Sequence, residues 1–71
     1  MLLSKRINKY INLAKLKRRA ADFFNLGNYS EALIWYKEEL SILTNLGLDT
    51  SSDAIKTLER IEYLKEHLDL N

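Results

Sequence analysis

The chain has 71 residues, a formal net charge of +1 and no cysteine, and 46% of its residues are hydrophobic, a share too high for a disordered chain. Its length allows one domain at most, and the lack of cysteine excludes a disulfide scaffold, a thiolate metal site and a cysteine nucleophile. No apolar run reaches the ~18 residues of a membrane-spanning helix, and no signal-peptide pattern begins the chain, so we expect a cytoplasmic protein.

Apolar residues at helical spacing predict a first helix over residues 3–25. Gly27 follows this segment and suits the left-handed backbone conformation found just beyond a helix end. A second helix is predicted over residues 29–46. We expect Asn28 to cap its N-terminus, with Glu31 as the partner in a capping box.

Gly47 ends the second helix in the same way, and the polar residues 49–52 offer caps for a third helix over residues 53–69. Three helices of similar length joined by short loops predict an all-α fold. The expected architecture is an antiparallel three-helix bundle that occupies residues 1–71 as a single domain.

Each predicted helix has an apolar stripe when its residues are plotted at ~100° per residue. The first stripe is broad and contains Leu3, Ile7, Tyr10, Leu13, Ala14, Leu16, Ala20, Ala21, Phe23 and Phe24. The second contains Tyr29, Ala32, Leu33, Tyr36, Leu40 and Leu43, and the third contains Ala54, Leu58, Ile61, Leu64 and Leu68. These stripes are the predicted core.

Charge is unevenly distributed: residues 1–25 carry seven basic residues and one acidic residue, a net +6, whereas residues 26–48 carry −2 and residues 49–71 carry −3. Either the basic first helix is neutralised by its acidic neighbours, or it is a surface for acidic partners or for weak contact with an anionic membrane. Nucleic acid is not expected as a partner, because the basic residues are scattered around the helix and its aromatic residues are assigned to the core.

The sequence offers no residues for catalysis or for binding a metal or cofactor. His67 is the single histidine, and we interpret it as a solvated residue near a helix C-terminus, where the helix dipole favours positive charge. No group of histidine and acidic residues has metal-ligand spacing, and neither glycine belongs to a phosphate-binding loop. We therefore expect a binding module that is not an enzyme.

Residues 20–36, AADFFNLGNYSEALIWY, contain the turn pattern G-N-Y-x-x-A-L-x-x-Y. This segment resembles the first two helices of the MIT (microtubule interacting and trafficking) domain, and a similar turn joins the helices of a tetratricopeptide repeat. Residues 58–68, LERIEYLKEHL, resemble the last MIT helix, whereas no second turn follows at the 34-residue period of tetratricopeptide arrays. The resemblance covers residues 7–69. Glu39 and Ile61 stand where the family has small residues.

The MIT resemblance implies a monomeric, non-catalytic module that binds the C-terminal tails of ESCRT-III subunits. It also implies an attached activity, most often an AAA ATPase, which tail binding recruits to membranes. Tails that bind as a helix between the second and third helices would contact the matching positions Leu40, Leu43, Thr44, Leu58, Ile61, Glu62 and Lys65. Tails that bind as an extended segment between the first and third helices would contact Leu13, Leu16, Lys17 and Ala20.

The residues alone leave two other functions open. Trp35, Ile42 and Leu46 share a flank of the second helix away from its core stripe. This flank either wraps a wide core or forms a contact, in which case the chain is a structural or oligomerising bundle. The shared turn leaves a tetratricopeptide-like peptide-binding fragment as a further alternative.

Overall fold

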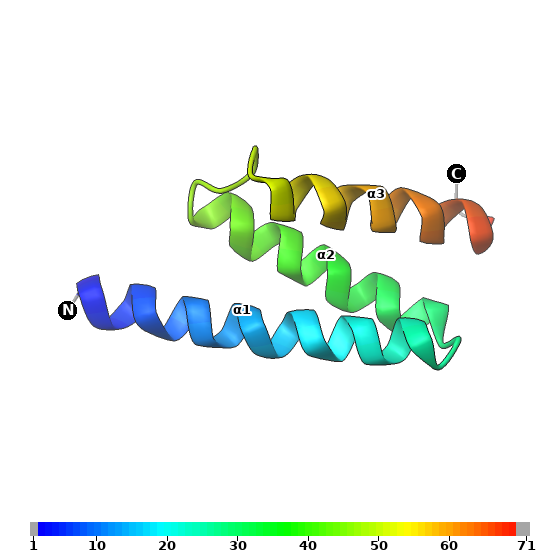
Figure 1. The fold of residues 1–71 in the computed structure, drawn as a ribbon, viewed down its shortest axis with the longest axis horizontal. Helices are drawn as coiled ribbons and strands as arrows, with labels where there is room; N and C mark the ends of the chain where they lie inside the picture. Colours follow the sequence, from blue (N-terminus) through cyan, green and yellow to red (C-terminus); the bar gives the residue numbers. More distant parts are fainter. Residues whose placement is uncertain (1, 70–71) are drawn as a thin grey trace.

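Three helices make up the structure, a computed structural model that describes the backbone of residues 2–69 and the side chains of residues 10–69. They are α1 (Leu2–Asn25), α2 (Tyr29–Asn45) and α3 (Ser52–His67). Consecutive helices run antiparallel, and α2 lies between α1 and α3 in the view of Figure 1. The expected all-α three-helix bundle is confirmed, and the helix bounds lie within two residues of those expected.

Both glycines adopt the left-handed conformation that the sequence predicts for them. Gly27 has φ 78° and Gly47 has φ 75°, values that only glycine adopts without steric cost. At the first turn the amide of Asn28 donates a hydrogen bond of 2.9 Å to the carbonyl of Phe23, five residues earlier. A hydrogen bond of the same spacing closes the second turn. Helices α1 and α2 therefore each end in a Schellman motif, which satisfies their last carbonyl groups and reverses the chain.

The N-termini of α2 and α3 are capped differently. The side-chain oxygen of Ser51 accepts a hydrogen bond from the amide of Ala54 at 3.2 Å, as expected of an N-cap. Asn28 makes no side-chain capping bond, so the expected capping box with Glu31 is wrong. The reason is that the Schellman motif of α1 already fixes the backbone of Asn28 at ψ 76°, outside the extended conformation of an N-cap.

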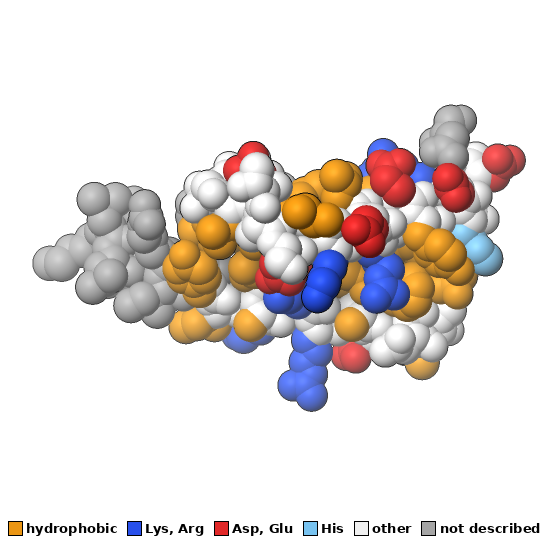
Figure 2. Space-filling view, turned by 45° about the horizontal axis from the view of Figure 1, so that its top comes forward, with side chains coloured by type: hydrophobic (Ala, Val, Ile, Leu, Met, Phe, Trp, Pro, Cys, Tyr) orange, Lys and Arg blue, Asp and Glu red, His pale blue; other side chains and the backbone are white. Residues whose placement is uncertain are grey.

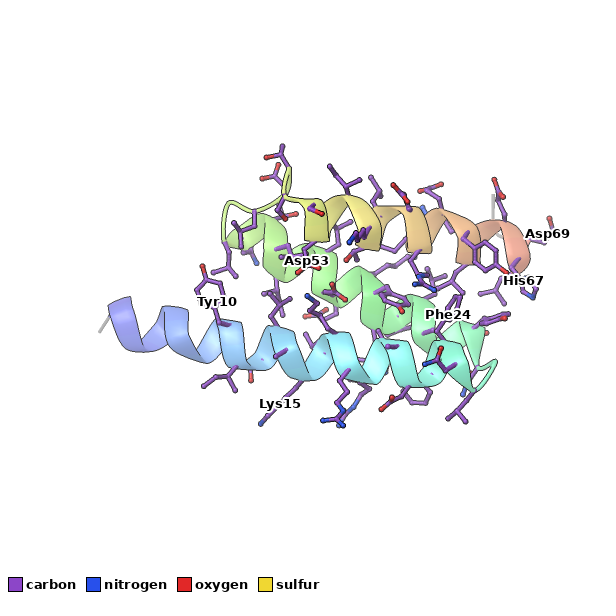
Figure 3. All side chains as sticks on the ribbon, viewed as in Figure 1. Tyr10, Lys15, Phe24, Asp53, His67 and Asp69 are labelled. Carbon is purple, nitrogen blue, oxygen red and sulfur yellow. The ribbon has the colours of Figure 1, made fainter. Side chains whose placement is uncertain are left out.

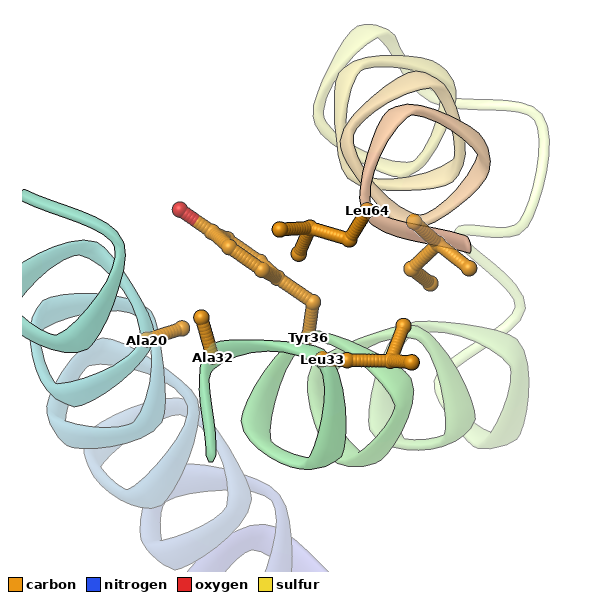
Figure 4. Close-up of a cluster of buried hydrophobic side chains, with 6 residues drawn as sticks. Ala20, Ala32, Leu33, Tyr36 and Leu64 are labelled. Atoms are coloured by element: carbon orange, nitrogen blue, oxygen red, sulfur yellow. The ribbon is translucent and has the colours of Figure 1, made fainter. Parts of the chain in front are cut away.

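The core consists of two clusters along α2. One cluster joins all three helices at one end of the bundle and contains Ala20, Ala32, Leu33, Tyr36, Ile61 and Leu64. In Figure 4 the methyl groups of Ala20 and Ala32 face each other, and this pair of small side chains allows α1 and α2 to approach closely. The other cluster contains Leu13, Leu43 and Ala54. Both clusters depend on α2, which is the central helix.

The core face of the third helix is confirmed at Ala54, Ile61 and Leu64 and differs from the prediction at one position. Leu58 is 48% exposed and does not belong to the core, whereas Thr57 is buried in its place. Thr57 tolerates burial because its hydroxyl lies 2.7 Å from a carboxylate oxygen of Glu39 and 2.8 Å from the carbonyl of Asp53. Glu39 is likewise buried, at 2% exposure, although it was not part of the predicted core.

The beginning of α1 also differs from the prediction. Tyr10 and Ala14 are exposed and were wrongly assigned to the core, and the predicted core residues Leu3 and Ile7 lie outside the described side chains. Helix α1 has 24 residues against 17 in α2 and 16 in α3. Its N-terminal part therefore extends beyond the other helices (Figure 1), and Tyr10 is 47% exposed there.

Candidate functional site

A shallow groove of about 400 Å³ lies between α2 and α3 and is open to solvent along one side. It is lined by Lys37, Leu40, Ser41, Thr44, Asn45, Leu58, Ile61 and Lys65. We call it the α2/α3 groove. Five of the seven positions that the MIT resemblance assigned to tail binding line it: Leu40, Thr44, Leu58, Ile61 and Lys65. The antiparallel packing of α2 on α3 brings these two sets of residues together.

The groove residues differ in how far a ligand can reach them. Ile61 is 3% exposed and forms the base of the groove, whereas Leu58 is half exposed at its edge. Leu43, also assigned to the site, is fully buried beneath and contacts the second core cluster instead. Glu62 is exposed beside the groove and lies 3.7 Å from the ammonium group of Lys65.

Charge is asymmetric along the α2/α3 groove. Lys37 and Lys65 line the groove at its end nearer the N-terminus of α2 and the C-terminus of α3. None of the lining residues is acidic. Glu62 adds one carboxylate outside the groove, and Figure 2 shows acidic side chains gathered toward the C-terminal end of α3. The groove thus combines an aliphatic base with cations at one end and carboxylates beyond its edge. This surface suits a short segment that carries apolar and charged side chains together.

The alternative site between α1 and α3 does not form one surface. Leu13 and Ala20 are buried in the core. Leu16 and Lys17 are ~100° apart around α1 and face different helices. Leu16 lines a groove with α2, whereas the ammonium group of Lys17 lies 2.5 Å from a carboxylate oxygen of Asp53 in α3. This ion pair joins α1 to α3, and a small cavity of about 200 Å³ lies beside it.

Side chains alone connect α1 to α3. In the part of the chain that the structure describes, no Cα atom of α1 lies within 8 Å of a Cα atom of α3. Besides Lys17 and Asp53, the guanidinium group of Arg60 lies 4.3 Å from the ring centroid of Phe24, and the rings of Phe24 and Tyr63 are 6.0 Å apart. The bundle is therefore held mainly by the two faces of α2.

Glu39 and Thr57 form a buried polar pair under the ion pair between Lys17 and Asp53. Burial raises the pKa of Glu39 above its usual value, while the Thr57 hydrogen bond and the nearby Lys17 act in the opposite direction. The pair was not predicted. Its one sequence signal was the presence of Glu39 where MIT domains carry a small residue.

A second groove, of about 480 Å³, lies between α1 and α2. It is lined by Asn12, Lys15, Leu16, Arg19, Ile34, Trp35, Glu38 and Ile42, and we call it the Trp35 groove. Trp35 and Ile42 belong, with Leu46, to the flank that the sequence left unassigned. All three also pack against the core, Trp35 against the first cluster and Ile42 and Leu46 against the second. The guanidinium group of Arg19 lies 5.0 Å from the centroid of the Trp35 ring.

Other kinds of site are absent from the described part of the chain. Within residues 2–69, no group of three histidine or acidic side chains is arranged to hold a metal ion. His67 is exposed and its ring lies 4.5 Å from that of Tyr29, edge to face, near the end of α3 (Figure 3). None of these three helices combines the length and apolar character that crossing a bilayer requires.

Comparison with known proteins yields no relative: no protein family, no curated protein and no solved structure matches the chain. The MIT resemblance therefore depends on residues 20–36 and 58–68 of this chain alone.

Proposed function

We propose that the chain is a non-catalytic interaction module that binds the C-terminal tail of an ESCRT-III-type subunit in the α2/α3 groove. In this proposal the tail binds as an amphipathic helix and recruits an attached activity, such as an AAA ATPase, to membranes. The observation that carries the proposal is the convergence of Leu40, Thr44, Leu58, Ile61 and Lys65 on one groove. The MIT resemblance had selected these residues from two separate segments of the chain.

The chemistry of the α2/α3 groove favours a helical ligand. Both walls are helices whose backbone groups are hydrogen-bonded internally, so a ligand is recognised through side chains alone. A helical tail satisfies its own backbone and can place aliphatic residues against Leu40, Leu58 and Ile61. An acidic tail residue would then pair with Lys65, and a basic one with Glu62. A groove this small gives weak binding, which becomes effective when several modules act together in an oligomer.

The proposal is tested with fluorescently labelled tail peptides of ESCRT-III subunits, whose anisotropy reports binding. Leu58→Asp places a charge in the groove at a half-exposed position, so the fold should be retained. It should weaken binding at least about tenfold, through lost apolar contact and an unpaired charge. Ile55→Asp is the matched control, because Ile55 is 52% exposed on the same helix but does not line the groove.

Circular dichroism of both variants establishes that α-helix content is unchanged. Equal affinities for the Leu58 and Ile55 variants would reject the α2/α3 groove as the binding site. Absence of wild-type binding at millimolar peptide would reject the tail-binding function itself.

A further inference from the structure

The Trp35 groove has the shape of a docking site for a helix, and it shares no lining residue with the α2/α3 groove. Its residues on α1 occupy positions 12, 15, 16 and 19, and those on α2 occupy positions 34, 35, 38 and 42. Both sets follow helical spacing, so the groove runs beside the two helices for about two turns, or ~10 Å. An elongated ligand that fills this groove therefore lies along α1 and α2.

The groove has an apolar base and an asymmetric edge. Leu16, Trp35 and Ile42 are half-buried in it, and Ile34 is 57% exposed at its side. Lys15 and Arg19 are the lining cations, one turn apart on α1, and both are exposed. Figure 3 shows Lys15 pointing away from α3.

The opposite edge of the groove, on α2, carries one charge. Glu38 is the acidic lining residue, so the two edges differ in sign. Figure 3 labels Lys15 on α1 and Asp53 on α3, and the two lie on opposite sides of the α1 ribbon in that view. The positive edge is therefore separate from the carboxylates of α3 and remains available to a ligand.

We propose that the Trp35 groove is a second docking site and that its occupant is an acidic amphipathic helix of another protein. Such a helix places aliphatic side chains on Leu16, Trp35 and Ile42. Carboxylates one turn apart on its flank pair with Lys15 and Arg19, because i and i+4 positions on both helices are ~6 Å apart. With the α2/α3 groove on the other side of α2, the module would connect two partners.

The geometry favours a peptide helix over other occupants. The apolar side chains lie in a concave groove, whereas a membrane surface is engaged by side chains that project outward. Trp35 is the one aromatic side chain among the lining residues, so successive bases have no stacking platform in the groove. A two-fold contact between copies of the chain would bring together two grooves that each carry two cations and one carboxylate, so both surfaces would have the same net charge.

Trp35 is the sole tryptophan of the chain, so its emission reports directly on this groove. The probe is a designed 16-residue helical peptide without tryptophan that carries a leucine stripe and glutamates four residues apart on one flank. A control peptide has lysine in place of each glutamate, and a second control has serine in place of each leucine. The glutamate peptide should shift Trp35 emission to the blue and bind about tenfold more tightly than either control.

Variants then separate this site from the tail-binding site. The double variant Lys15→Glu/Arg19→Glu should reverse the preference, so that the lysine peptide binds more tightly. Both residues are exposed, and circular dichroism checks that the fold is retained. Leu58→Asp should leave the emission shift unchanged. Failure of tail binding would therefore not affect this result, and the converse also holds.

Three outcomes would overturn the proposal. The first is equal binding of the glutamate and lysine peptides. The second is a blue shift with vesicles of phosphatidylcholine and phosphatidylserine but none with the glutamate peptide, which would identify a membrane contact. The third is self-association in sedimentation that the Lys15→Glu/Arg19→Glu variant abolishes, which would identify a second copy of the chain as the occupant.

Discussion

Leu58 and Ile61 lie one turn apart on α3, and their environments differ sharply: Leu58 is 48% exposed and Ile61 is 3% exposed. Complete burial of a leucine side chain is worth ~1.5–3 kcal/mol, so truncating the half-exposed Leu58 to alanine should cost about 1 kcal/mol. Ile61→Ala leaves a cavity between α2 and α3 and should cost ~2–5 kcal/mol. Since a core of this size supplies only ~3–5 kcal/mol in total, the Ile61 variant should be largely unfolded.

The comparison is made by urea and thermal unfolding followed by circular dichroism at 222 nm. One kcal/mol corresponds to about 4–8 °C in Tm for a domain of this size, so Leu58→Ala should lower Tm by that amount and Ile61→Ala by more than twice as much. Equal losses of stability would mean that Leu58 is a core residue. In that case α3 is oriented differently and the α2/α3 groove does not exist.

Three further predictions concern the polar pair, the first turn and the caps. Burial raises the pKa of Glu39, so the folded chain holds this proton more tightly than the unfolded chain. The free energy of unfolding should therefore fall as pH rises through that pKa, and Glu39→Gln should remove this fall in urea titrations over roughly pH 4 to 8. Gly27→Ala should cost ~1–2 kcal/mol in thermal melts, because φ is 78° and an added Cβ meets no neighbouring atom that would add a steric term. Ser51→Ala should cost ~1 kcal/mol and Asn28→Ala less than ~0.5 kcal/mol by urea midpoint, because Ser51 alone makes a capping bond.

The helices and turns were predictable because their determinants are local. A glycine beyond an apolar segment marks the end of a helix whatever packs on that helix, and Gly27 and Gly47 both act in this way. Asn28 shows where local reasoning fails. Only Leu26 and Gly27 separate Asn28 from α1, so Asn28 is both the last residue of the Schellman motif and the N-cap position of α2. Its backbone has the conformation that the Schellman motif requires.

Hydropathy predicted most of the buried face of α3 but not the choice of Thr57 over Leu58. Thr57 and Leu58 are neighbours in sequence and ~100° apart around the helix, so either side chain can lie at the edge of the core face. Hydropathy selected the leucine. The fold buries the threonine because Glu39 of α2 and the Asp53 carbonyl of its own helix satisfy its hydroxyl, and Glu39 comes within reach only when α2 packs on α3.

The candidate sites were predictable in unequal measure. The α2/α3 positions came from a family pattern that encodes which faces of two helices meet, so most of them converge. The Trp35 groove was visible only as an unassigned apolar flank. Its cations, Lys15 and Arg19, were counted in the net charge of the first segment, because the sequence does not say which of seven basic residues face α2.

The most direct test of tail binding is an amide chemical-shift titration of the 15N-labelled chain with C-terminal tail peptides of ESCRT-III subunits. Our account predicts saturable shifts that cluster at Leu40, Thr44, Leu58, Ile61 and Lys65, the residues of the α2/α3 groove. Shifts confined to the contact between α1 and α3, or no shifts at millimolar peptide, would contradict it.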